Sequence, residues 1–134
     1  MKRILVAVIA IFVLWSVMDF VIHGVILRPS YAATASLWRP MSQMKTSVLY
    51  LSVFIAALTF AVIYSRLVSR KGILTGLQYG FLFGLGTGVS MGYGSYSVMP
   101  IPYHMALTWF LGTLVEAVIG GVILGAVIRE RRAG

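Results

Sequence analysis

Cysteine is absent from this 134-residue chain, and acidic residues are scarce. Without cysteine the protein has no disulfide bond, no thiolate metal site and no cysteine nucleophile. Only three residues are Asp or Glu, and charged residues of both signs make up 10% of the chain. No Ser-His-Asp set and no acidic pair on a soluble face can be assembled from so few groups. The sequence therefore predicts a non-enzymatic protein without a cofactor.

Apolar residues dominate the composition of the chain. They make up 60% of the chain, and the mean hydropathy is +0.95, outside the range of an ordinary soluble domain. A chain of this length corresponds to a single domain, residues 1–134. A domain of that size cannot hide so much apolar surface from water. We expect the lipid bilayer to be its main partner.

The basic residues outnumber the acidic ones, which gives a net charge of +8. Such a charge can indicate nucleic-acid binding, but here the Lys and Arg residues form short clusters between apolar runs. They do not line a groove or a helix face. The pattern carries information about membrane topology, and we expect no nucleic-acid partner.

Four apolar runs are long enough to cross a membrane, which takes about 20 helical residues. They cover residues 4–27, 46–65, 73–97 and 104–128. The sequence therefore predicts an all-α fold, a bundle of four transmembrane helices. The alternative for the first run is a cleaved signal peptide ending at 33–35. That alternative is disfavoured because its apolar part exceeds the usual length of about 7–15 residues.

The distribution of basic residues predicts the orientation of the bundle. Eight of the eleven Lys and Arg residues lie on one side: Lys2, Arg3, Arg66, Arg70, Lys71, Arg129, Arg131 and Arg132. The other side holds Arg28, Arg39 and Lys45. The positive-inside rule then places both termini in the cytoplasm, in a multi-pass protein of the bacterial inner membrane.

Glycines recur at every fourth position of the third predicted helix: Gly76, Gly80, Gly84, Gly88 and Gly92. In water such a row would weaken a helix, by about 1 kcal/mol for each glycine. In lipid it forms a groove into which another helix can pack closely. We expect this glycine row to be a packing surface for a helix of the same chain, of a second copy or of another subunit.

Two of the acidic residues lie inside predicted spans, Asp19 in the first and Glu116 in the fourth. His23 follows Asp19 by four residues, so both side chains share one helix face. At 1.5 Å per residue, His23 lies about 6 Å, Asp19 about 12 Å and Glu116 about 18 Å from the outer ends of their helices. The first and fourth helices of an up-and-down bundle are neighbours. The sequence therefore predicts one polar cluster in the outer half of the membrane.

Arg28, Arg39 and His104 are expected at the mouth of this cluster. Three interpretations of the cluster are open. The carboxyl groups can join helices through hydrogen bonds. They can instead mark a proton or cation path, as intramembrane ionisable groups often do. The third interpretation is a metal site with His23, His104, Asp19 and Glu116 as ligands, although no compact ligand motif is present.

Several stretches resemble small four-span bacterial membrane proteins that are described only as hypothetical. The stretches are DFVIHG at 19–24, LWRP at 37–40, MGYG at 91–94, MPIP at 99–102 and residues 109–116. The resemblance covers most of the chain but implies no activity. Small multidrug transporters also have four helices, but they carry a lone glutamate in the first helix, where this chain has Asp19 and His23.

These observations predict an accessory or assembly subunit of a membrane complex, or a homo-oligomer. The alternative is a small proton- or cation-coupled transporter that uses Asp19, His23 and Glu116.

Overall fold

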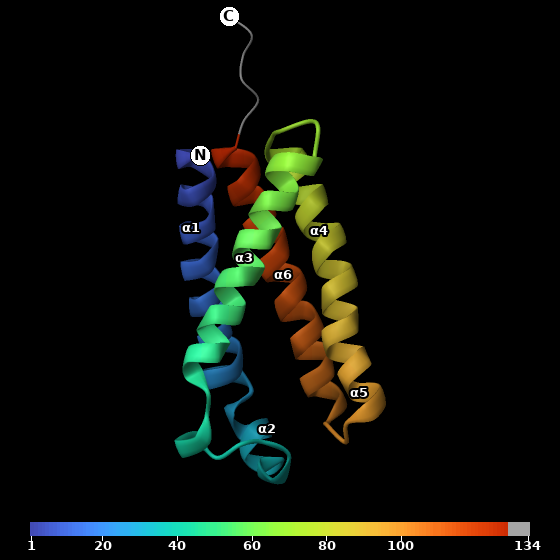
Figure 1. Ribbon diagram of the computed structural model, residues 1–134. Helices are drawn as coiled ribbons and strands as arrows, with labels where there is room; N and C mark the ends of the chain where they lie inside the picture. Colours follow the sequence, from blue (N-terminus) through green and yellow to red (C-terminus); the bar gives the residue numbers. More distant parts are fainter. Residues whose placement is uncertain (129–134) are drawn as a thin grey trace, which may run out of the picture.

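The computed structural model describes residues 1–128, and the chain is all-helical, with 86% helix and no strand in that range. Figure 1 shows long helices side by side, with the N-terminus and the α3–α4 connection at one end and α2 and α5 at the other. The α-helices are α1 (Lys2–Asp19), α2 (Arg28–Ala33), α3 (Thr46–Leu67), α4 (Ile73–Val89), α5 (Ser95–Val98) and α6 (Tyr103–Val127). Two π-helical segments, η1 (Phe20–Ile26) and η4 (Ser90–Gly94), continue α1 and α4. The 3₁₀ turns η2 (Ala35–Leu37) and η3 (Met41–Gln43) lie between α2 and α3.

Three helical segments are long and apolar enough to cross a membrane. They are Lys2–Ile26 with 25 residues, Thr46–Leu67 with 22 and Tyr103–Val127 with 25. They correspond to the predicted spans 4–27, 46–65 and 104–128. The remaining predicted span, 73–97, consists of α4 with 17 residues, followed without a break by η4 and α5.

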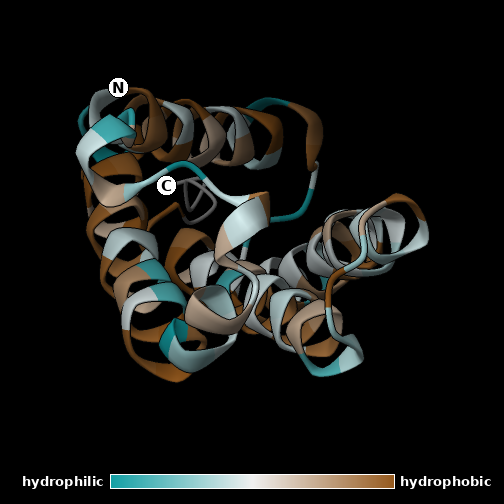
Figure 2. Cartoon of the chain, turned by 90° about the horizontal axis from the view of Figure 1, so that it is seen from below, coloured by the Kyte–Doolittle hydropathy of each residue, from teal (hydrophilic) through white to brown (hydrophobic). Residues whose placement is uncertain are grey.

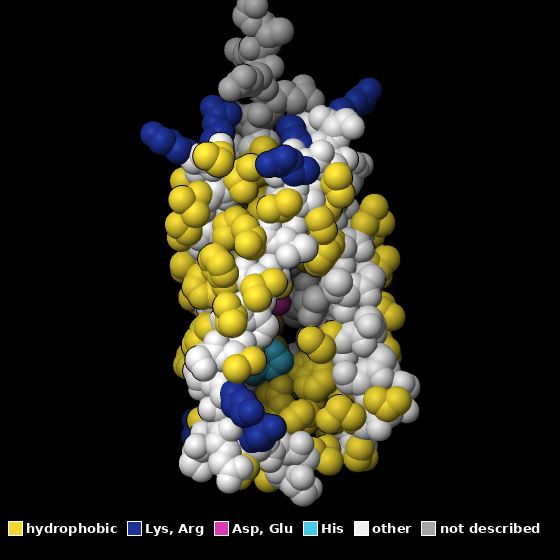
Figure 3. All heavy atoms as spheres, viewed as in Figure 1, with side chains coloured by type: hydrophobic (Ala, Val, Ile, Leu, Met, Phe, Trp, Pro, Cys, Tyr) yellow, Lys and Arg dark blue, Asp and Glu magenta, His cyan; other side chains and the backbone are white. Residues whose placement is uncertain are grey.

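The outer surface of the helices is largely apolar. Large hydrophobic side chains are exposed on every long helix, among them Val13, Leu51, Leu82 and Leu111. Figure 2 shows hydrophobic residues on the outward faces of the bundle. In Figure 3 the Lys and Arg side chains gather at the two ends and leave the middle apolar. This distribution is typical of a protein whose middle is surrounded by lipid.

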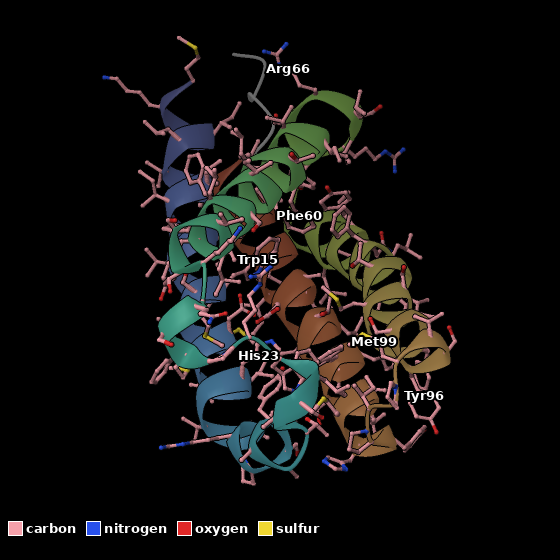
Figure 4. The ribbon with its side chains drawn as sticks, turned by 60° about the horizontal axis from the view of Figure 1, so that its bottom comes forward. Trp15, His23, Phe60, Arg66, Tyr96 and Met99 are labelled. Atoms are coloured by element: carbon pink, nitrogen blue, oxygen red, sulfur yellow. The ribbon has the colours of Figure 1, made fainter. Side chains whose placement is uncertain are left out.

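The main core lies between α1, α3 and α6, in the half of the bundle nearer the N-terminus. Phe60 is fully buried, and its ring centroid lies 5.3 Å from that of Trp15, 4.7 Å from that of Tyr79 and 4.9 Å from that of Phe83. Figure 4 shows Trp15 and Phe60 close together between α1 and α3. Aromatic rings therefore fill this half of the molecule.

The glycine row of α4 and η4 packs against α6 of the same chain. All five glycines are buried. A Cβ at Gly84 would lie 2.8 Å from the Cβ of Ala117, and one at Gly88 would lie 2.9 Å from the carbonyl oxygen of Phe110. At Gly80 it would run into the carbonyl oxygen of Ala117. Because glycine lacks a Cβ, the two backbones approach more closely than any other residue would allow.

The segment after the first span differs from expectation. The sequence predicts one short helix that begins with Ser30 as its cap and aligns Tyr31, Ala35 and Trp38. Instead α2 begins at Arg28, with Pro29 in its first turn, and ends at Ala33. Proline is favoured in a first turn because its missing N–H is not needed there. The predicted basic tail, Arg129, Arg131 and Arg132, lies outside the described residues.

Candidate functional site

Asp19, His23 and Glu116 lie together where η1 passes α6. Asp19 ends α1, and its Oδ1 lies 3.7 Å from Nε2 of His23. The carboxyl groups of Asp19 and Glu116 lie close enough for the charge on one to influence the other. The indole Nε1 of Trp15 donates a hydrogen bond of 2.8 Å to the backbone oxygen of Glu116, which fixes α1 against α6 at this level. We call Asp19, His23 and Glu116 the polar cluster.

The polar cluster is half-buried at the bottom of a hollow. The side chains of His23 and Asp19 are 43% and 32% exposed. Oε1 of Glu116 is shielded from solvent and has no hydrogen-bond partner, and the same holds for Oγ of Ser16. Figure 3 shows a hollow between α3 and α4, with an acidic side chain and a histidine visible inside it. A buried carboxyl oxygen without a partner is costly, so it favours any proton or cation that reaches it.

Tyr31 connects His23 to α6. Its hydroxyl lies 2.6 Å from Nδ1 of His23 and accepts a hydrogen bond of 3.0 Å from Nε1 of Trp109. A phenol has a single proton to donate. If that proton goes to Nδ1, neutral His23 carries its own proton on Nε2, facing Asp19. Burial raises the pKa of Tyr31, so its hydroxyl stays protonated at neutral pH.

Three aromatic residues surround His23 on the outer side of the polar cluster. The ring centroids of Tyr31 and Trp38 are 5.2 Å apart, those of Trp38 and Trp109 are 6.1 Å apart, and His23 lies 6.4 Å from Trp109. Nε1 of Trp38 donates to Oγ1 of Thr34 at 2.8 Å. We call Tyr31, Trp38 and Trp109 the aromatic wall.

The sequence did not indicate that Tyr31 and Trp38 belong to the site. Tyrosine and tryptophan in a connection between spans are common at the membrane surface, so their sequence context points there and not to a binding site. Trp109 does carry a signal in the sequence, because its three-four spacing with Thr113 and Glu116 places the three residues on one helix face. A usable signal for Tyr31 was the short connection that follows His23, which can fold an aromatic ring back onto the end of the first helix.

The residues expected at the mouth lie apart from the carboxyl groups. Arg28 and Arg39 are exposed, and neither pairs with Asp19 or Glu116 in the part of the chain that the structure describes. His104 uses its Nε2 in a contact of 2.7 Å with Oγ of Ser30. Ser30 precedes Tyr31, so His104 supports α2 without joining the polar cluster.

The four residues considered as metal ligands do not form a site. Within residues 1–128, no group of three or more His, Cys, Asp or Glu side chains could hold a metal ion. Nε2 of His104 contacts Ser30, and Nε2 of His23 faces the carboxyl group of Asp19. The metal interpretation of His23, His104, Asp19 and Glu116 therefore lacks its ligand set.

Comparison with protein-family models, with curated proteins and with solved structures found no match.

Proposed function

We propose that this chain is a four-span protein of a bacterial cytoplasmic membrane, with both termini in the cytoplasm. The third of the four spans consists of α4, η4 and α5, which form one helical run from Ile73 to Val98. The described basic residues support the orientation: Lys2, Arg3, Arg66, Arg70 and Lys71 lie toward the N-terminal end of the bundle, against Arg28, Arg39 and Lys45 at the other. In this arrangement the glycine row acts as a zipper that fastens α4 to α6 within one chain.

Single cysteines test the orientation, because the natural chain has none. Ser42 and Ser69 are both exposed and lie in connections at opposite ends of the bundle. In intact bacteria we expect a membrane-impermeant maleimide to label Ser42→Cys at once. Ser69→Cys should react only after the membrane is permeabilised. Labelling of Ser69→Cys in intact cells would contradict the orientation.

The polar cluster supports a transport function. We infer that the protein is a small proton- or cation-coupled transporter in which Asp19, His23 and Glu116 bind the ion. One observation carries this inference: two acidic side chains meet inside apolar helices, with no Lys or Arg paired to either in residues 1–128. Two ionised carboxylates so close together in lipid repel each other strongly. A proton or cation between them removes that repulsion.

The two halves of the bundle differ in a way that suits a carrier. On the outer side the hollow leads to the polar cluster (Figure 3). On the cytoplasmic side, Trp15, Phe60, Tyr79 and Phe83 pack around one another. This arrangement corresponds to a form that is accessible in its outer half and closed on the cytoplasmic side, and a transport cycle would require the aromatic packing to open.

Proton or cation flux into liposomes that contain the purified protein tests the proposed transport function. With an internal pH dye and an imposed gradient, we expect Asp19→Asn and Glu116→Gln each to lower proton or cation flux about tenfold or more, because each removes an ionisable group of the site. Thr87→Val is the matched control, since the Thr87 hydroxyl bonds only within its own helix, to the oxygen of Phe83 at 2.7 Å. Unchanged flux in both acidic variants would contradict the proposal and leave the carboxyl groups a structural role.

The accessory-subunit function remains a second candidate. The glycine row no longer supports it, because α6 of the same chain covers that face. What supports it is the outer half of α3, where residues 46–52 are all exposed and a helix of another subunit could pack. Extraction from native membranes in a mild detergent tests this candidate. A companion protein or a second copy at constant stoichiometry would support it, and a lone monomer would contradict it.

A further inference from the structure

The hydrogen-bonding capacity of the tryptophans around the polar cluster is fully used. Nε1 of Trp15 donates to the backbone of Glu116, that of Trp38 to Thr34, and that of Trp109 to Tyr31. An indole has no acceptor and only this one donor. The rings can therefore offer a ligand only apolar area and the negative face of their π-systems. That combination favours cations, and tryptophan is the best of the aromatic residues for it.

The rings of the aromatic wall stand at steep angles to one another. The planes of Tyr31 and Trp38 meet at 84°, and those of Trp38 and Trp109 meet at 69°. Ring faces in such an arrangement point in different directions and form a corner. His23 borders this corner and contacts Asp19, so the π faces and the carboxyl groups belong to one continuous surface.

The polar cluster is poorly suited to a bare metal ion. Such ions take four or more ligand atoms. Here the imidazole of His23 is engaged with Asp19 and Tyr31, and residues 1–128 hold no group of three His, Cys, Asp or Glu that could bind a metal. A substituted ammonium ion needs fewer ligand atoms than a metal ion. Its charge is met by a carboxylate, and its alkyl or aryl groups are met by aromatic faces.

The hollow also opens in a direction that suits a partly apolar ligand. It lies between α3 and α4 and opens on the flank of the bundle (Figure 3), which lies within the membrane in the proposed orientation. At the outer end, Arg39 and Lys45 line a groove beside Trp38, and both are exposed. These positive charges repel a cation that approaches from water along that groove. The approach from the membrane, between α3 and α4, has no such barrier.

We propose that the polar cluster and the aromatic wall together bind an organic cation, a substituted ammonium ion with apolar groups, which enters through the hollow between α3 and α4. The cationic nitrogen lies between the Asp19 and Glu116 carboxyl groups and the aromatic wall. This proposal rests on the proposed cation-binding role of the polar cluster and specifies its ligand.

Intrinsic fluorescence tests the binding, because all three tryptophans of the chain lie around the site. Purified full-length protein in nanodiscs is titrated with benzyltrimethylammonium chloride, against sodium chloride at equal ionic strength. We expect a saturable change in tryptophan emission with the organic cation and none with sodium. A response that rises linearly with both salts would overturn the proposal.

Substitutions of Trp38 test whether the change in tryptophan emission comes from binding at the aromatic wall. Trp38→Leu keeps Trp15 and Trp109 as reporters, and we expect it to raise the dissociation constant about tenfold. Trp38→Phe keeps a ring and should stay within a few-fold of the natural protein. Tyr96→Leu is the control, because Tyr96 is an exposed aromatic residue that lies apart on α5 (Figure 4). Equal affinities of Trp38→Leu and Tyr96→Leu for benzyltrimethylammonium would show that the aromatic wall does not bind the cation.

The outcome separates this proposal from the one on which it rests. If Asp19→Asn abolishes proton flux but the natural protein does not bind benzyltrimethylammonium, the ligand is a proton alone. The organic-cation proposal then fails while the proposed transporter stands. If flux and binding are both absent, both proposals fail.

Discussion

Replacing Gly80 by alanine is expected to push α4 away from α6 and to lower the stability of the protein markedly. The new methyl group would meet the backbone oxygen of Ala117 and lie 2.9 Å from its carbonyl carbon. Backbone atoms of a helix cannot move aside as a flexible side chain can. Overpacking of this kind costs about 1–3 kcal/mol. A lower midpoint of thermal unfolding in mild detergent is the expected result.

Gly86→Ala provides the matched control on the same helix. A Cβ at Gly86 would meet nothing within 4 Å. The substitution is the same, and the intrinsic helix propensity should favour alanine at both positions by about 1 kcal/mol. We therefore expect Gly86→Ala to be neutral or stabilising. Equal midpoints for the two variants would show that α4 does not pack on α6 through the glycine row.

Phe60→Ala is expected to cause the largest loss of stability among single substitutions in the core. Phe60 is 0% exposed and is surrounded by the rings of Trp15, Tyr79 and Phe83. Its removal leaves a cavity between three helices, and large-to-small changes of this kind cost about 3–5 kcal/mol. Lipid cannot refill such a site easily. Unfolding of the purified protein by sodium dodecyl sulfate, followed by circular dichroism, measures the effect.

Phe81→Ala makes the same chemical change on the surface. Phe81 is 45% exposed on α4, in the region where the bundle meets lipid. Lipid can occupy the volume that the ring leaves, so we expect a small fraction of the loss caused by Phe60→Ala. A comparable loss at both positions would mean that the aromatic packing around Phe60 does not form the core of the bundle.

The helices were predictable because the chain has few polar residues to interrupt them. Long apolar runs and the need for internal backbone hydrogen bonds in lipid are sufficient to predict an all-helical fold. The spacing of Gly76 to Gly92 predicted a packing face. It could not name the partner, because the row alone carries no information about which helix covers it. The complementary small residues Ala117, Gly121 and Gly125 on α6 become meaningful only in the structure.

The sequence was sufficient to predict the acidic residues of the candidate site, but not its aromatic residues. The spacing of Asp19 and His23 places them on one helix face. Glu116 stands out because the chain has only three acidic residues. The proximity of Glu116 depends on how α1 and α6 are rotated, which the hydrogen bond from Trp15 fixes. Tyr31 and Trp38 were missed because α2 ends at Ala33 and Trp38 is extended, so no helical spacing relates the two residues.

Cross-linking of positions 19 and 116 tests most directly whether the two acidic residues share one site. The chain has no other cysteine, so the pair Asp19→Cys and Glu116→Cys can be treated in membranes with a short bifunctional thiol reagent and read by mass spectrometry. We predict an intramolecular link within each chain. The pair Asp19→Cys and Gly86→Cys should give none: two residues are about half a turn of helix, so Gly86 lies on the face of α4 opposite Gly84 and Gly88, which pack on α6. Separate labelling of positions 19 and 116 without a link would contradict the shared site.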